Sequence, residues 1–131
     1  MIDDLRRVLE NEQDIAYALL FGSGGRGALR PTSDVDVAIE LHPGARRDTA
    51  TLGRLAARLE SATGRPVDLI LIDEAPSPLA YRIFREGRIL IERDHAALVE
   101  RKAGAILAYL DFRPVEKRCT DGVLRAAAGR G

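Results

Sequence analysis

The chain has 131 residues, of which 46% are hydrophobic and 31% charged, a composition typical of one folded domain with its own core. Its 20 basic and 20 acidic residues balance, which argues against the strongly positive surface of a protein that grips long nucleic acid. One cysteine excludes an internal disulfide, and the sequence has neither a signal core nor a run of about 20 apolar residues. We therefore expect a cytoplasmic protein that binds neither membranes nor, directly, nucleic acid.

The first half of the chain predicts a helix, two strands and a second helix. Apolar residues at helical spacing mark a helix over residues 2–12, and the apolar run 16–21 predicts a buried strand. Residues 34–41 (DVDVAIEL) alternate strictly, so they predict a strand with one apolar and one acidic face. The apolar face holds Val35, Val37, Ile39 and Leu41, and the other holds Asp34, Asp36, Ala38 and Glu40. A helix is expected from about residue 48 to 62, ending at Gly64.

The second half predicts a mostly buried strand over 67–72, a short helix within 74–87, a strand over 88–92 and a helix over 94–110. The last helix places five apolar residues on one stripe: Leu98, Val99, Ile106, Leu107 and Leu110. Beyond Pro114 the sequence is basic and weakly patterned. We expect a domain over residues 1–112 and a C-terminal tail over 113–131 that is frayed or depends on a partner.

The acidic face of the strand at 34–41 carries the first candidate site. Asp34 and Asp36 are two positions apart, so their carboxylates project from the same face. Their repulsion must be relieved by water, a basic neighbour or a cation. Magnesium is commonly held by one or two carboxylates together with substrate phosphates. The pair therefore fits either a solvated acidic face or a site for a metal-bound nucleotide.

A glycine cluster precedes this strand. Gly22 and Ser23 follow the buried strand at 16–21, and glycines leave backbone N–H groups free to approach an anion. The Ser23 hydroxyl and the Arg26 guanidinium could then hold phosphate oxygens. The alternative is a flexible glycine turn in which Ser23 caps a helix.

Asp68 is the one polar residue in VDLILI, where an unpaired buried carboxylate would be expensive to desolvate. It could instead face water at a strand end. If its strand lies beside the strand at 34–41, three carboxylates converge on one cation site.

Together, these residues resemble a known family. GS, ten residues, then DVD, with a later aspartate in VDLILI, is similar to the pattern of the DNA polymerase beta superfamily, specifically its minimal nucleotidyltransferases (MNT). LFGS, TSDVDVAI and REGRILIE carry the resemblance over about residues 17–92. It implies the nucleotidyltransferase fold, an α/β (α+β) domain with a small mixed or antiparallel sheet backed by helices.

The resemblance also implies roles for the candidate residues. Asp34, Asp36 and Asp68 would be catalytic carboxylates that bind magnesium, two ions in the family's pattern, and Asp68 would also help to position or deprotonate an acceptor hydroxyl. Gly22, Ser23 and Arg26 would hold the triphosphate of ATP. Many relatives have a basic residue directly after the serine, whereas this chain has glycine there.

Chains similar to this one are commonly antitoxins of HEPN/MNT pairs, which implies transfer of AMP to a tyrosine of a HEPN ribonuclease toxin within a hetero-oligomer. Two alternatives stay open. One is an enzyme that nucleotidylates a small hydroxylated substrate such as an aminoglycoside. The other is a non-catalytic antitoxin that acts by binding alone. Leu107, Leu110 and Phe112 could form a docking surface, although the helix at 94–110 could equally close the core.

Overall fold

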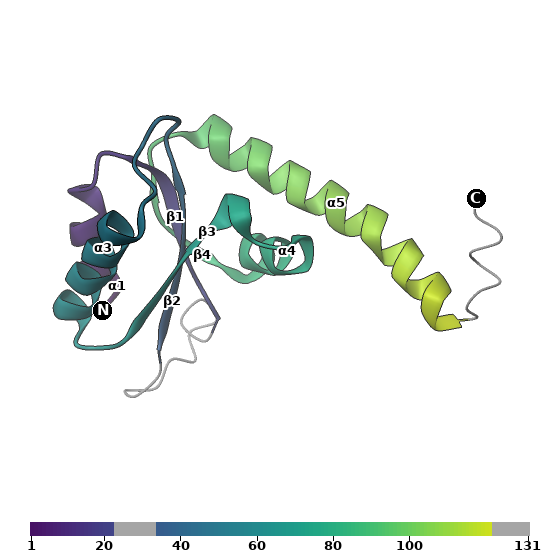
Figure 1. Cartoon of the computed structure of the whole chain (residues 1–131), viewed down its shortest axis with the longest axis horizontal. Coiled ribbons are helices and arrows are strands. Elements are labelled where there is room, and N and C mark those ends of the chain that lie inside the picture. Colours follow the sequence, from purple (N-terminus) through teal and green to yellow (C-terminus); the bar gives the residue numbers. More distant parts are fainter. Residues whose placement is uncertain (23–33, 122–131) are drawn as a thin grey trace.

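The described residues of the computed structural model are 1–22 and 34–121, with side chains described to residue 111, and they form one four-stranded sheet (Figure 1). Its strand order is β3-β2-β1-β4, with β1 antiparallel to both of its neighbours and β2 parallel to β3. The sheet is therefore mixed, as the family resemblance implied. Its strands are β1 (Ile15–Phe21), β2 (Val35–Leu41), β3 (Val67–Leu71) and β4 (Arg88–Glu92).

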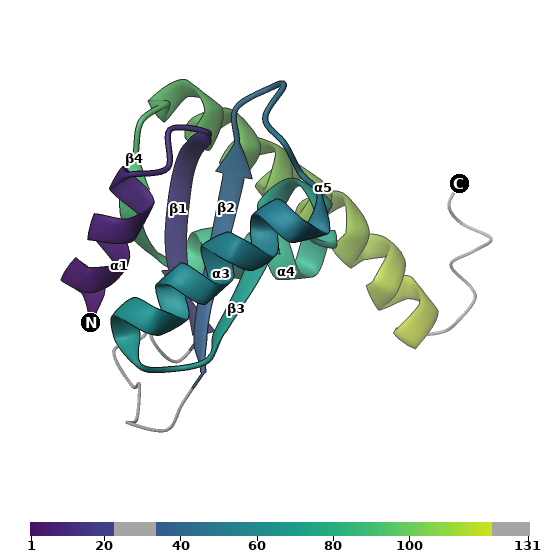
Figure 2. The same cartoon turned by 60° about the vertical axis from the view of Figure 1, so that its left-hand side comes forward.

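Helices cover both faces of this sheet (Figures 1 and 2). Helices α1 (Ile2–Glu10) and α3 (Thr49–Thr63) lie on one face, and α4 (Ser77–Glu86) and α5 (His95–Asp121) lie on the other. A short 3-10 helix, η1 (Ile72–Glu74), joins β3 to α4. Within the described residues, every helix is too short or too polar to span a lipid bilayer.

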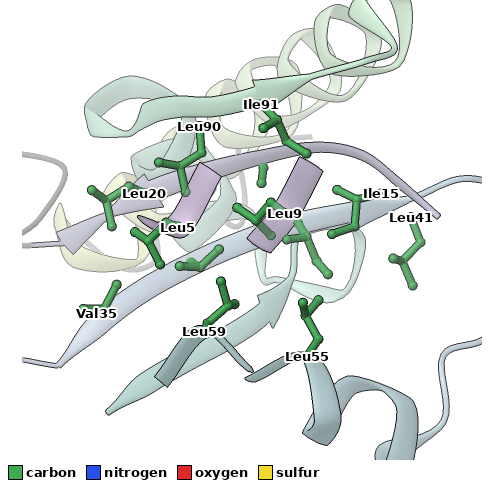
Figure 3. Packing of buried hydrophobic residues seen from close by; sticks show 13 residues of the cluster. Leu5, Leu9, Ile15, Leu20, Val35, Leu41, Leu55, Leu59, Leu90 and Ile91 are labelled. Carbon is green, nitrogen blue, oxygen red and sulfur yellow. The ribbon is translucent and has the colours of Figure 1, made fainter. Parts of the chain in front are cut away.

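The strict alternation of β2 determines which face packs against α1 and α3. Its apolar residues meet two leucines from each of these helices in a buried cluster (Figure 3). The members that define this contact are Val35, Val37 and Ile39 of β2, Leu5 and Leu9 of α1, and Leu55 and Leu59 of α3. The acidic residues of β2 consequently lie on the face that carries α4 and α5.

Helix α3 begins and ends where the sequence predicts. The Asp48 carboxylate accepts hydrogen bonds from the backbone N–H and the hydroxyl of Thr51, and these bonds lower the pKa of Asp48 to about 2. Gly64 ends the helix in a left-handed conformation with φ of 70°.

Two arginine side chains connect α1 to the rest of the fold. The Arg93 guanidinium donates hydrogen bonds of 2.6–3.3 Å to four main-chain carbonyl oxygens between α1 and the start of β1. Arg6 Nε donates to the carbonyl oxygen of Leu90 on β4, at 2.9 Å. Both contacts join residues more than 70 positions apart in the chain.

Two expectations are wrong. Strand β3 is not mostly buried, because it lies at the edge of the sheet and its five residues are half-buried or exposed. The apolar stripe on the last helix does not pack as one face, since Leu98 is buried whereas Leu107 is 63% exposed.

Helix α5 also continues well past residue 110, through Pro114 to Asp121. Proline lacks a backbone donor and usually ends a helix, which is why the sequence favoured an earlier end. The boundary at 112 between domain and tail stays a prediction. The side chain of Phe112 and residues 122–131 lie outside the described parts of the chain.

Candidate active site

Strand pairing brings the predicted site residues to one end of the sheet. The parallel register of β2 and β3 places Asp36 directly opposite Asp68. The antiparallel register of β1 and β2 places Asp36 opposite Phe21, the residue before Gly22. Asp34 immediately precedes β2. Gly22 after β1, Asp34 and Asp36 at the start of β2, and Asp68 at the start of β3 therefore meet at this end of the sheet.

The main chain at Gly22 lies directly against the Asp36 side chain. Gly22 has a φ of 68°, a left-handed conformation that L-residues adopt at a penalty. A Cβ atom added there would overlap Asp36 Oδ2 and would lie 3.4 Å from its carboxyl carbon. Conformation and space therefore both require glycine beside the central carboxylate.

Asp36 is the electrostatic centre of this group. Its side chain is half-buried, whereas Asp34 and Asp68 are exposed. Burial raises the pKa of Asp36 above its usual value, and the charges of Asp68 and then Asp34 raise it further. Asp68 and Asp34 thus lie close enough to Asp36 to oppose the ionisation of its carboxyl group.

The donor set suits a hard divalent cation. Carboxylate oxygens are the ligands that magnesium prefers, and a cation would relieve the repulsion that raises the pKa of Asp36. Among the described side chains, no group of three or more His, Cys, Asp or Glu residues is already arranged to hold a metal ion. The residues fit magnesium chemically, while their side chains are not positioned as a complete ligand shell.

The predicted site residues thus fall into two groups. The structure places Gly22, Asp34, Asp36 and Asp68 at one end of the sheet. Ser23 and Arg26, predicted to hold the triphosphate, lie outside the described residues.

A polar network at the other end of the same face was not predicted. The Tyr17 hydroxyl donates a 2.6 Å hydrogen bond to Glu40 Oε1, and Arg101 Nε of α5 donates to the same oxygen at 3.2 Å. Burial, then the hydrogen bond to Glu40, raises the pKa of Tyr17. The alternation of β2 placed Glu40 on this face, but nothing local in the sequence connects it to a residue 61 positions away.

This network borders a cavity of about 390 Å³ between η1, α4 and α5. Glu40, Asp73, Ser77 and Arg101 are among its polar lining residues. None of the three site aspartates lines it, so the cavity and the carboxylate cluster are separate features of one face.

Comparison with known proteins identifies a sequence family and several similar folds. The family described as "Polymerase beta, Nucleotidyltransferase" matches residues 3–96. A comparison with curated proteins gives no match.

Three similar solved structures are toxin–antitoxin complexes. One, a complex with AMP-PNP, is 22% identical, covers 94% of this chain and 98% of its own, and has a TM-score of 0.77. A second contains the tri-AMPylated Shewanella oneidensis HEPN toxin with MNT antitoxin, at 20% identity, 95% and 99% coverage and a TM-score of 0.70. A third, an MntA–HpeT mutant with two aspartates two positions apart replaced by glutamate, has 19% identity, 95% and 98% coverage and a TM-score of 0.75. At these identities the likeness supports the fold.

Proposed function

The chain belongs to the polymerase beta nucleotidyltransferase family, and we propose that it is an antitoxin that transfers AMP from ATP to a tyrosine hydroxyl of a cognate HEPN ribonuclease toxin in the cytoplasm. The observation that carries the proposal is the meeting of Gly22, Asp36 and Asp68 at one end of the sheet. Transfer of AMP from a magnesium-bound nucleotide requires a cluster of carboxylates to hold the metal.

The similar complexes support the nucleotide and the acceptor. One contains AMP-PNP and another contains a tri-AMPylated HEPN toxin. A chain of this fold and family, with Asp34 and Asp36 spaced like the two aspartates replaced in the MntA–HpeT mutant, is a natural candidate for the same reaction.

The roles proposed for the carboxylates follow from their surroundings. Asp34, Asp36 and Asp68 would hold magnesium, two ions in all, and the main chain at Gly22 lies directly against the Asp36 carboxylate. Asp68, opposite Asp36, is exposed and can orient the acceptor hydroxyl and receive its proton. Bound magnesium supplies positive charge to the transferred phosphoryl group and the departing pyrophosphate. Gly22, Ser23 and Arg26 hold the triphosphate.

The transfer reaction can be tested by intact-mass measurement. The probe is the product of an adjacent reading frame that carries an R-x4-H ribonuclease motif, incubated with this protein, ATP and magnesium. We expect the partner to gain mass in AMP units and peptide fragmentation to place them on tyrosine. Asp36→Asn should abolish the gain. Asp3→Asn, a change of equal size on the exposed surface of α1, should preserve it.

Other outcomes would favour the alternatives. A stable complex without added mass would overturn the transfer proposal and indicate an antitoxin that acts by binding alone. Transfer of AMP to an aminoglycoside, but not to the partner protein, would indicate a small-molecule enzyme.

Magnesium binding has a readout that does not depend on activity. Millimolar magnesium should raise the unfolding temperature of the wild-type protein, because a ligand that binds only the folded state stabilises it. The double variant Asp34→Asn with Asp36→Asn should show no such rise. An equal rise in both proteins would remove these two carboxylates from the proposed metal site.

A further inference from the structure

Helix α5 extends beyond the body of the protein. It has 27 residues and is therefore about 40 Å long at 1.5 Å per residue. Among the side chains of α5 described up to residue 111, the buried ones are Leu98 and Ala105, in its first half. Figure 1 shows the second half continuing away from the sheet and α4, and Figure 2 shows the same projection from another side.

An apolar stripe runs along α5 on a side that the fold does not use. Val99, Leu107 and Leu110 are 48%, 63% and 49% exposed, and at 100° per residue they lie on one arc together with Ala103 and Ile106. We refer to Val99, Ala103, Ile106, Leu107 and Leu110 as the α5 stripe.

The two faces of α5 have different partners. Leu98 and Ala105, which pack on the sheet side, lie on a separate arc of the helix. The ring of Tyr109 stacks on Tyr81 of α4 with centroids 4.1 Å apart, which fixes the rotation of α5 against α4. The stripe is thus held outward by contacts on the opposite side.

Single exposed apolar residues are common on protein surfaces, but three large ones aligned on a projecting helix are typical of an interface. The rims of the stripe are charged. Glu100 and Asp111 lie along one side and Lys102 along the other, all three exposed. A complementary partner would present an apolar surface with basic groups at one border and an acidic group at the other.

The similar solved complexes indicate which protein binds on the α5 stripe. The AMP-PNP complex aligns with 94% of this chain, so only about eight of 131 residues fall outside the match. Since α5 beyond Ala105 contains 16 residues, at least about half of this projecting part has an equivalent in a chain that was crystallised as part of a toxin–antitoxin complex.

We propose that the α5 stripe is the surface on which this protein binds its toxin, an inference that rests on the proposed function. In both views the far end of α5 lies at the level of the sheet end that carries Gly22 (Figures 1 and 2). A protein bound along α5 as far as its end would therefore extend to the level of the carboxylates.

The test compares two surface variants. Leu107→Glu with Leu110→Glu keeps good helix formers on α5 while placing charge on the stripe. Ile89→Glu is the matched control, because Ile89 is a similarly exposed apolar residue, 44% exposed on β4, that does not belong to the α5 stripe. The probe is the toxin protein made inactive by replacement of the histidine in its R-x4-H motif, and its dissociation constant is measured by calorimetry.

We expect the α5 double variant to bind the toxin at least about 100-fold more weakly than wild type, since apolar residues at the centre of an interface dominate affinity. Ile89→Glu should bind as wild type does. At saturating toxin, the double variant should transfer AMP at the wild-type rate, because its active site is intact. The milder Leu107→Ala, which cannot disturb the helix, should weaken binding about tenfold.

Wild-type affinity in the double variant would overturn this inference and leave the proposed function standing. If the wild-type protein alone is a dimer that the double variant dissociates while toxin binding is unchanged, the stripe joins two copies of this chain and the inference is wrong. If the wild type binds toxin but transfers no AMP, the transfer proposal fails, and affinity still decides the role of the stripe. If the wild type does not bind the toxin, both proposals fail.

Discussion

Replacing Gly22 by alanine should damage the carboxylate cluster more than the fold. Two effects combine at this position. A non-glycine residue at φ of 68° incurs about 1–2 kcal/mol of backbone strain. The new Cβ would also overlap Asp36 Oδ2, so that oxygen must retreat by about 1 Å to reach an ordinary contact distance. Together the two effects should lower the free energy of unfolding by about 2–4 kcal/mol.

Gly64→Ala is the matched control for this change. Gly64 has nearly the same φ, 70°, but an added Cβ there meets no atom within 4 Å. It should therefore show the backbone strain alone, about 1–2 kcal/mol. Urea unfolding followed by circular dichroism measures both losses, and the difference between them isolates the overlap with Asp36.

The rate of AMP transfer should also distinguish Gly22→Ala from Gly64→Ala. Displacement of a catalytic carboxylate by about 1 Å can reduce a rate by about 100-fold. Gly22→Ala should lose AMP transfer to at least that extent, whereas Gly64→Ala should retain it. Equal stability losses together with unchanged transfer in Gly22→Ala would refute the role assigned to this contact.

A double-variant cycle checks the cause. With Asp36 replaced by alanine, nothing remains for the Cβ of Gly22→Ala to displace. In that background the substitution should be no more destabilising than Gly64→Ala. Additive losses would mean that the overlap with Asp36 is not the source of the effect.

Three further predictions concern stability. Because the pKa of Asp36 is raised above 3.8, the folded state binds its proton more tightly than the unfolded chain does, and stability falls as pH rises through the folded-state pKa. Asp36→Asn should thus unfold at a higher temperature than wild type at pH 7 but not near pH 3, and an equal difference at both pH values would contradict this. Arg93→Ala removes a guanidinium shared by four carbonyl oxygens and should lower the free energy of urea unfolding by about 2–4 kcal/mol, with little recovery in Arg93→Lys. The raised pKa of Tyr17 means that its neutral form stabilises the fold below pH 10 and that this contribution is lost above it, so Tyr17→Phe should flatten the alkaline decline of the unfolding temperature.

Local signals were enough to predict most elements of this fold. The alternation of DVDVAIEL identified β2 and both of its faces, because a period of two has few explanations other than a strand. Gly64 marked the end of α3 for an equally local reason. Asp34 and Asp36 could be placed on one face from their spacing alone.

Features that depend on distant contacts could not be predicted. Whether a strand is central or at an edge is decided by its neighbours, and the apolar sequence of β3 resembles that of a buried strand although it has one neighbour. Asp68 lies beside Asp36 because β2 pairs with β3, and this pairing could be assumed from the sequence but not predicted from it. Part of the requirement for glycine at position 22 arises from the Asp36 carboxylate, which is 14 positions away in the chain.

The hydrogen bond from Arg6 to Leu90 also affects how copies of the molecule meet one another. An edge strand offers unpaired backbone groups to any other strand, which makes it a starting point for aggregation, and β4 is such an edge with Ile89 exposed on it. Because Arg6 Nε already donates to the Leu90 carbonyl oxygen, an incoming strand would have to displace the Arg6 side chain before it could pair there. The Arg6 side chain of the first helix therefore opposes edge-to-edge pairing at this point of β4 at high protein concentration.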